Sequence, residues 1–97
     1  MEVKQTIDES EGLSYTKAAK LIIDAYNKVR SGKYTKFGFL GLIEYWLDFA
    51  EVTNEEDIEI EQIITEIHSI SYEEDIEIYE RVKQIGKLIH PLKKPIR

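Results

Sequence analysis

Residues 37–51 read FGFLGLIEYWLDFAE, and this stretch contains the only Trp and all three Phe of the chain. At the period of an α-helix, its apolar side chains form two adjacent stripes and leave only a narrow acidic strip. A helix that is apolar around most of its circumference must be covered by other elements. We therefore expect residues 37–51 to form the central helix of a small bundle. The two stripes are Leu40, Ile43, Leu47 and Ala50, and Phe39, Leu42, Trp46 and Phe49.

Three further segments carry apolar residues at helical spacing, so the sequence predicts an all-α, single-domain four-helix bundle. Its helices are expected at residues 14–30, 37–51, 54–69 and 72–90. Ninety-seven residues fit one domain, 1–97, with residues 1–12 as a polar lead and residues 91–97 as a basic tail. Pro91 is expected to end the last helix.

The hexapeptide EEDIEI occurs at residues 55–60 and again at residues 73–78. Each copy overlaps a residue pair with capping-box spacing, Thr53 with Glu56 and Ser71 with Glu74. We therefore predict that each copy opens a helix. Only a very short connection at Ile70 and Ser71 then remains between the last two helices, which predicts a tight hairpin.

Several classes of function are excluded or disfavoured by composition. The absence of Cys excludes disulfides, thiolate zinc sites and Cys nucleophiles. No apolar run reaches 18 residues, so no membrane span is expected, and residues 1–12 lack the apolar core of a signal peptide. These features predict a cytoplasmic protein.

No pattern of catalytic or metal-binding residues is legible. The acidic runs lack the Gly of a calcium loop, and the spacing of Glu66 and His68 differs from that of di-iron bundles. Phosphate-binding Gly-rich loops and nucleophile motifs are also missing. We therefore expect no enzymatic activity, no catalytic residues, no metal and no cofactor.

The formal net charge of −6 hides a strong segregation of charge along the chain. Residues 37–80 contain fourteen Asp or Glu and no Lys or Arg, whereas residues 81–97 contain six Lys or Arg and no acid. Acidic helix starts explain residues 55–57 and 73–75, but they do not explain the missing cations. A basic protein partner does, through electrostatic steering and complementarity. Nucleic acid is not an expected ligand, because the acidic stretch would repel phosphates.

A candidate contact surface lies on the predicted last helix, where Tyr72, Ile76 and Tyr79 share one face among acidic residues. Two interpretations stay open: this face packs under the first helix as core, or it is an exposed aromatic anchor with an acidic rim. On the second interpretation, the expected partner-binding residues are Asp48, Glu55, Glu56, Asp57, Glu59, Tyr72, Glu73, Asp75, Ile76, Glu77, Tyr79 and Glu80.

These features together resemble the small acidic helical immunity proteins of bacterial toxin systems, such as those that inhibit colicin-like nucleases or contact-dependent and other polymorphic toxins. The resemblance is carried by GLIEYWLDFAEV at residues 41–52, NEEDIEIEQIITEI at residues 54–67 and SYEEDIEIYERV at residues 71–82. It implies a bacterial inhibitor whose acidic helical surface binds a cognate basic toxin domain. Tyr72 and Tyr79, with the acids around them, would make the contact.

Two other classes of binding protein fit the same composition. One is a regulatory or adaptor bundle, including a nucleic-acid mimic that occupies a DNA-binding protein by spreading its charges along an elongated face. The other is a structural bundle that forms a homodimer through a shared apolar face. An interface between the basic end of one copy and the acidic end of another is a further route to self-assembly.

Overall fold

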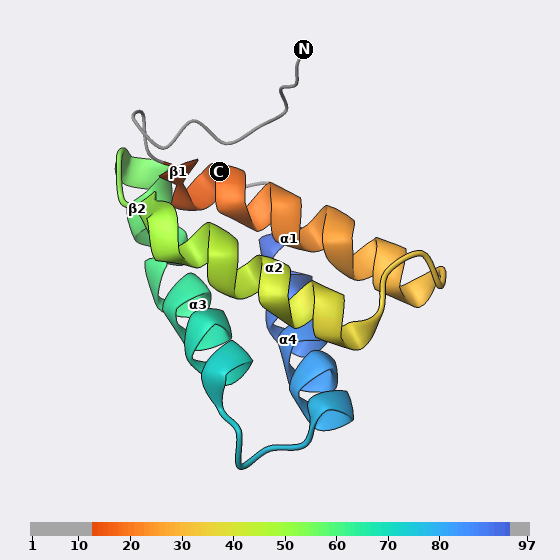
Figure 1. Ribbon diagram of the computed structural model, residues 1–97. Helices are drawn as coiled ribbons and strands as arrows, with labels where there is room; N and C mark the ends of the chain where they lie inside the picture. The colour runs from red at the N-terminus through yellow and green to blue at the C-terminus, as the bar shows by residue number, and fades with distance from the viewer. Residues whose placement is uncertain (1–12, 94–97) are drawn as a thin grey trace.

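Four α-helices and one short parallel strand pair make up the computed structural model, which describes residues 13–93 (Figure 1). Residues 1–12 of the polar lead and residues 94–97 of the basic tail lie outside the described part of the chain. The elements in order are β1 (Leu13–Ser14), α1 (Tyr15–Arg30), α2 (Lys36–Phe49), β2 (Ala50–Glu51), α3 (Glu55–Tyr72) and α4 (Ile78–Leu92). The predicted all-α four-helix bundle is confirmed.

Helices α1 and α2 lie side by side and run in opposite directions, and α3 and α4 form a second pair that crosses them (Figure 1). The core lies between the two pairs. Helix α2 contributes four fully or nearly fully buried side chains, Phe39, Leu40, Ile43 and Leu47. Each such side chain stabilises the fold by roughly 1.5–3 kcal/mol relative to exposure. In the second predicted stripe of α2, Phe39 is fully buried, whereas Leu42, Trp46 and Phe49 are half-buried.

The connection between α1 and α2 forms as its residue types predict. Gly32 follows the end of α1 and has φ +85°, the left-handed conformation that favours glycine. Thr35 then caps α2, because its Oγ1 accepts a hydrogen bond of 2.9 Å from the Gly38 amide.

Helix α2 ends at Phe49, two residues earlier than predicted, because Ala50 and Glu51 are extended and pair with the start of the described chain. Leu13 lies opposite Ala50 and Ser14 lies opposite Glu51 in a parallel register. This two-residue ladder was not predicted, since two residues carry no periodic signal. It places the N-terminus of α1 beside the segment that leads into α3.

Asp57 is completely buried in the first turn of α3 and joins these segments through hydrogen bonds. Its Oδ1 accepts from the backbone amide and the hydroxyl of Thr16, at 2.7 and 2.6 Å. Its Oδ2 accepts from the amide and hydroxyl of Thr53, at 2.6 and 2.9 Å, and from the Asn54 amide at 3.2 Å. Five donors therefore replace the water that this carboxylate loses on folding.

The ionised form of Asp57 is stabilised without a basic neighbour within salt-bridge distance among residues 13–93. Burial raises the pKa of Asp57, but the hydrogen bonds donated by Thr16 and Thr53 outweigh burial and lower it from 3.8 to about 2. The capping box of α3 also uses this residue: it is formed by Asn54 and Asp57, so the predicted pair Thr53 and Glu56 was wrong.

The predicted start of the fourth helix was wrong as well. Helix α3 continues through Tyr72, and the Ser71 hydroxyl donates to the His68 carbonyl at 2.7 Å instead of capping a new helix. Residues 73–77 form the connection, and α4 begins at Ile78. The Arg81 guanidinium holds this connection by donating to the carbonyls of Ile76 and Ser71, at 2.8 and 3.2 Å. Pro91 lies inside α4, which ends one residue later, at Leu92.

Gly41 offers a direct test of the α2 surface, because a Cβ built on this residue meets nothing within 4 Å. Ala is favoured over Gly inside a helix by up to about 1 kcal/mol. We therefore expect Gly41→Ala to raise the free energy of unfolding by roughly that amount. Chemical denaturation of the two proteins measures the difference, and a loss of stability would contradict an open position at Gly41.

Candidate protein-binding surface

Large apolar side chains are exposed at several places on the bundle. Two of these side chains, Tyr45 and Tyr72, face the same acidic region. Tyr45 on α2 is 48% exposed and Tyr72 at the end of α3 is 49% exposed. The exposure of Tyr72 contradicts the interpretation in which its face is core. We define the acidic–aromatic surface as Glu44, Tyr45, Asp48, His68 and Tyr72.

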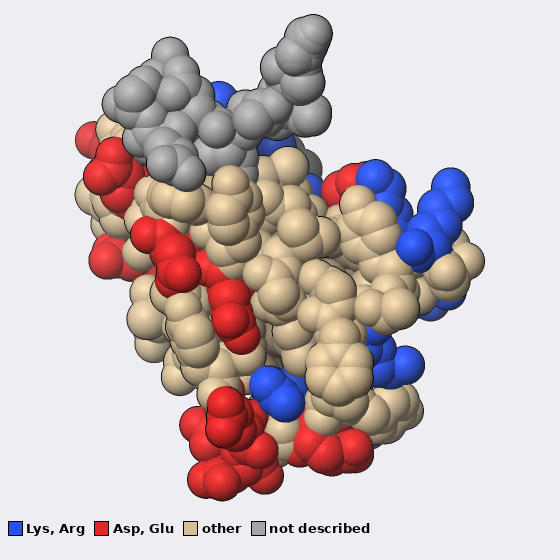
Figure 2. All heavy atoms as spheres, viewed as in Figure 1, with Lys and Arg blue, Asp and Glu red and all other residues tan. Residues whose placement is uncertain are grey.

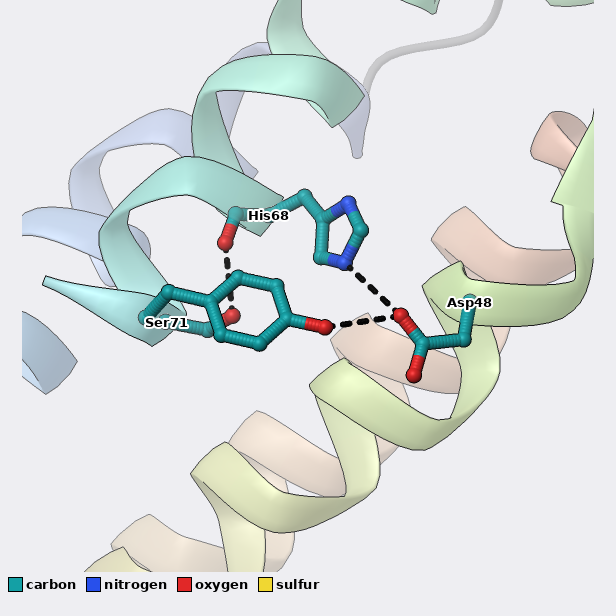
Figure 3. Close-up of polar contacts among 4 residues, drawn as sticks. Asp48, His68 and Ser71 are labelled. Carbon is teal, nitrogen blue, oxygen red and sulfur yellow. Dashed lines mark hydrogen bonds and ion pairs between the residues drawn. The ribbon is translucent and has the colours of Figure 1, made fainter.

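Asp48 is the polar centre of this surface (Figure 3). Its Oδ1 accepts a hydrogen bond of 2.7 Å from the Tyr72 hydroxyl and lies 3.3 Å from His68 Nε2. The His68 contact is not aligned as a hydrogen bond, so Nε2 is buried without a hydrogen-bond partner, and the contact becomes an ion pair when His68 is protonated. The His68 and Tyr72 rings lie 4.9 Å apart, which fixes the tyrosine against α3.

The electrostatics of this surface favour a positively charged partner. Hydrogen bonding to Asp48, followed by burial and by the negative charges of Asp48 and Glu44, raises the pKa of Tyr72 above 10.0. Tyr72 therefore stays protonated at neutral pH and donates its hydroxyl proton to Asp48. The Asp48 side chain is still 56% exposed, so its carboxylate can accept further hydrogen bonds from another molecule.

Tyr45 extends the surface along α2. Its ring packs edge-on against Phe49, with the ring centroids 4.9 Å apart. This contact holds an exposed aromatic side chain one turn from Asp48 on the same helix. An aromatic group held in place beside a carboxylate loses little conformational entropy on binding.

The predicted partner-binding residues are only partly brought together. Asp57 was wrong as a contact residue, because it is buried and all its hydrogen bonds are internal. The predicted Tyr72, Ile76 and Tyr79 face does not exist on one helix: Tyr72 ends α3, Ile76 lies in the connection and Tyr79 lies in α4. Tyr79 is 57% exposed, but its ring lies under Lys36, 5.9 Å from Nζ to the ring centroid.

Tyr72 and Tyr79 thus contact opposite ends of α2, since Asp48 and Lys36 are twelve residues apart and about 18 Å apart along a helix. The remaining predicted contact residues fall into two groups outside the acidic–aromatic surface. Glu55, Glu56 and Glu59 are exposed at the start of α3, whereas Glu73, Asp75, Glu77 and the half-buried Glu80 surround the α3–α4 connection.

The acidic side chains are not neutralised by the cations of α4. Within residues 13–93, the ion pairs are Lys28 with Asp24, at 3.2 Å, and the His68 contact to Asp48. Figure 2 shows acidic side chains over the C-terminal part of α2 and the neighbouring part of α3, with basic side chains gathered near the α1–α2 connection. The carboxylates of residues 37–80 therefore have no Lys or Arg as an ion-pair partner among residues 13–93.

Three residues of the acidic–aromatic surface were missed by the sequence-based prediction: Glu44, Tyr45 and His68. The available signal was the position of Glu44 and Tyr45 on the narrow polar side of residues 37–51. His68 carried no such signal, because its contact with Asp48 depends on the packing of α3 against α2.

Two further kinds of site are absent from the described residues. No group of three or more His, Asp or Glu side chains in residues 13–93 is placed to hold a metal ion. In the same part of the chain, no helix has the length and hydrophobicity needed to cross a membrane.

The chain matches no protein-family model, no curated protein and no solved structure. Its function therefore has to be inferred from the charge, exposure and contacts of its own residues.

Proposed function

We propose that this protein is a non-enzymatic inhibitor, an immunity protein that binds a basic toxin domain through the acidic–aromatic surface. The observation that carries the proposal is the Asp48–Tyr72 pair, an exposed carboxylate and an exposed aromatic ring held together by a 2.7 Å hydrogen bond. Interfaces derive most of their energy from a few such anchored Tyr, Trp and Arg contacts. The resemblance to immunity proteins adds the class of partner, and a cytoplasmic location goes with it.

The mechanism is occlusion of the partner's basic surface. Lys or Arg side chains of the toxin replace water around Asp48 and Glu44, and the rings of Tyr45 and Tyr72 cover the apolar part of the contact. The net charge of −14 over residues 37–80 steers the encounter and raises the association rate at low salt. Binding of this kind needs no chemistry from the inhibitor.

Capture from extract of the native cells on the immobilised protein tests this proposal. We expect a basic protein to be recovered, to be released by salt, and to lose its activity when the inhibitor is added back. Tyr72→Ala and Tyr45→Ala are each expected to weaken binding at least about 30-fold, the effect of losing 2 kcal/mol at an interface. Isothermal titration calorimetry with the purified partner measures the loss.

Tyr34→Ala is the matched control, because Tyr34 is a partly exposed tyrosine in the basic α1–α2 connection. It should leave the affinity unchanged. Equal losses in all three variants would contradict the assignment of the site. Capture of a DNA-binding protein that DNA displaces would instead identify a nucleic-acid mimic.

A further inference from the structure

A groove of about 250 Å³ lies at the other end of α2, away from Asp48. Its floor is apolar and partly aromatic, and three cations surround it. The groove is lined by Tyr26, Val29 and Arg30 of α1, Lys36 of α2, and Tyr79, Val82 and Lys83 of α4. We call this the basic groove. Three helices meet there, so its shape is fixed by the packing of the bundle.

The cations of the basic groove have no carboxylate partner within the described residues. Neither Arg30, Lys36 nor Lys83 forms an ion pair in residues 13–93. Lys36 lies over the Tyr79 ring, where a cation is attracted by the aromatic face, but this contact leaves the positive charge uncompensated. Three like charges around an apolar floor favour an occupant that is both acidic and partly apolar.

The α3–α4 connection has the complementary chemistry. Residues 73–77 read EEDIE, and their four carboxylates form no ion pair with any described residue. Arg81, the cation nearest to them in sequence, donates to the Ile76 and Ser71 carbonyls instead. The connection is thus held in shape through its backbone while its acidic side chains point to solvent.

The acidic connection and the basic groove are neighbours, because Tyr79 lines the groove and lies two residues after Glu77. At the lower end of the face in Figure 2, acidic side chains lie directly beside basic ones. A two-fold symmetric interface needs a patch that is complementary to itself. A patch with adjacent acidic and basic halves meets this condition, since a two-fold axis between them brings each half opposite the other half of the second copy.

We infer that the occupant of the basic groove is the acidic connection of a second copy of this chain, in a two-fold symmetric dimer. The exposed Tyr79 lies near the axis. Phe37, which is 77% exposed and follows Lys36, adds apolar area at the same end of the molecule. This dimer does not use Tyr45 or Asp48. The test of the dimer therefore does not depend on the proposed inhibitor function.

Molar mass in solution, measured by light scattering during size-exclusion chromatography, tests the dimer. At low salt we expect twice the 11.4 kDa of one chain, and at about 1 M salt, where the screening length falls to about 3 Å, we expect the monomer. A monomer at low salt and high protein concentration would overturn the inference.

Two charge-reversed variants locate the interface. In Lys36→Glu/Lys83→Glu the groove and the connection are both acidic, and in Glu73→Lys/Glu74→Lys/Asp75→Lys both are basic, so each variant alone should be monomeric. An equimolar mixture restores both contacts and should give a dimer of one copy of each. Circular dichroism confirms that each variant is helical.

Each alternative outcome is distinct. Dimers formed by either variant alone would place the interface elsewhere and contradict the inference. A mixture that stays monomeric would contradict the pairing of groove and connection. Long alternating assemblies in place of a dimer would mean a head-to-tail contact without two-fold symmetry.

Discussion

Asp57→Asn is expected to lower the free energy of unfolding by about 3–5 kcal/mol, the cost typical of breaking a buried charged network. An amide has one oxygen, so its NH2 group must face either the two donors of Thr16 or the three donors of Thr53 and Asn54. In either orientation, buried donors lose their acceptor, at about 1–3 kcal/mol each. Urea denaturation of both proteins at pH 7 measures the loss.

Asp75→Asn is the matched control for this substitution. It removes the same unit of charge from the second copy of the hexapeptide, at an exposed position in the α3–α4 connection. At about 1 M salt, where the inferred dimer that uses Asp75 is expected to be dissociated, the control should change stability by no more than about 0.5 kcal/mol. If the two variants were equally stable, the five hydrogen bonds of Asp57 would have no energetic role.

The pH dependence of the stability of the natural protein and of Asp57→Asn gives an independent measure of the contribution of the Asp57 carboxylate. The pKa of Asp57 is lowered on folding from 3.8 to about 2, so its stabilising effect is complete above 3.8 and is lost as the pH falls through 2. At about 1.4 kcal/mol per pKa unit, the shift corresponds to about 2–3 kcal/mol. The stability gap between the natural protein and Asp57→Asn should therefore be constant near neutral pH and shrink between about pH 4 and pH 2. A constant gap down to pH 2 would contradict the shift.

The second large effect is expected at Gly86, where α4 packs against Tyr26 of α1. A Cβ built on Gly86 would lie 2.6 Å from Cζ and 2.9 Å from Cε1 of Tyr26, well inside van der Waals contact. The Tyr26 ring is held in turn by Phe39, with ring centroids 5.9 Å apart. Gly86→Ala should therefore cost about 1–3 kcal/mol from overpacking, even though Ala is the better helix former.

A double-mutant cycle separates the clash from the change in helix propensity. In a Tyr26→Leu background the clashing ring is gone, so Gly86→Ala should become neutral or stabilising. Gly41→Ala is a second control, because the same substitution at Gly41 places the new Cβ in open space and changes only the helix propensity. Equal destabilisation by Gly86→Ala in both backgrounds would show that Tyr26 is not the obstacle.

The two copies of EEDIEI show how much of this fold was legible in the sequence. Copy 55–60 opens α3, as predicted, whereas copy 73–78 is mostly the connection before α4. The local sequences differ at the residue just before each copy. Asn54 caps α3 through a 3.0 Å hydrogen bond from the Asp57 amide, but the equivalent Tyr72 has no side chain suited to capping. The capping-box spacing at Ser71 was therefore misleading, because the residue beside the hexapeptide decides its structure.

The helical periodicity was a better guide than the helix ends. Ile85 and Ile89 are buried on α4 as its apolar stripe predicted, and Ala18 and Ile22 are buried on α1. Helix α2 ends at Phe49 because Ala50 and Glu51 pair with residues 37 positions earlier in the chain, which local pattern does not encode. Likewise, Asp57 looked like one of three interchangeable acids, and only tertiary packing selects it for burial.

The residues of the candidate surface were only partly named by the sequence. An acidic surface with an exposed tyrosine was one of the two interpretations left open, and Tyr72 and Asp48 were among the residues named for it. Their pairing links residues 24 positions apart and follows from the crossing of α2 and α3, so it lay beyond any local signal. The exposure of Tyr45 was suggested by its place at the edge of the polar strip.

The hydrogen bonds between Thr16 and Asp57 join residues 41 positions apart, which has a consequence for the order of folding. Closing so long a loop costs chain entropy before any contact is gained, whereas a helix pair joined by a short connection forms locally. We therefore expect the two hydrogen bonds from Thr16 to Asp57 to form late, after α1 and α2 have paired. Interactions absent from the folding transition state act mainly on the unfolding rate. We therefore expect loss of these two hydrogen bonds to raise the unfolding rate more than it lowers the folding rate.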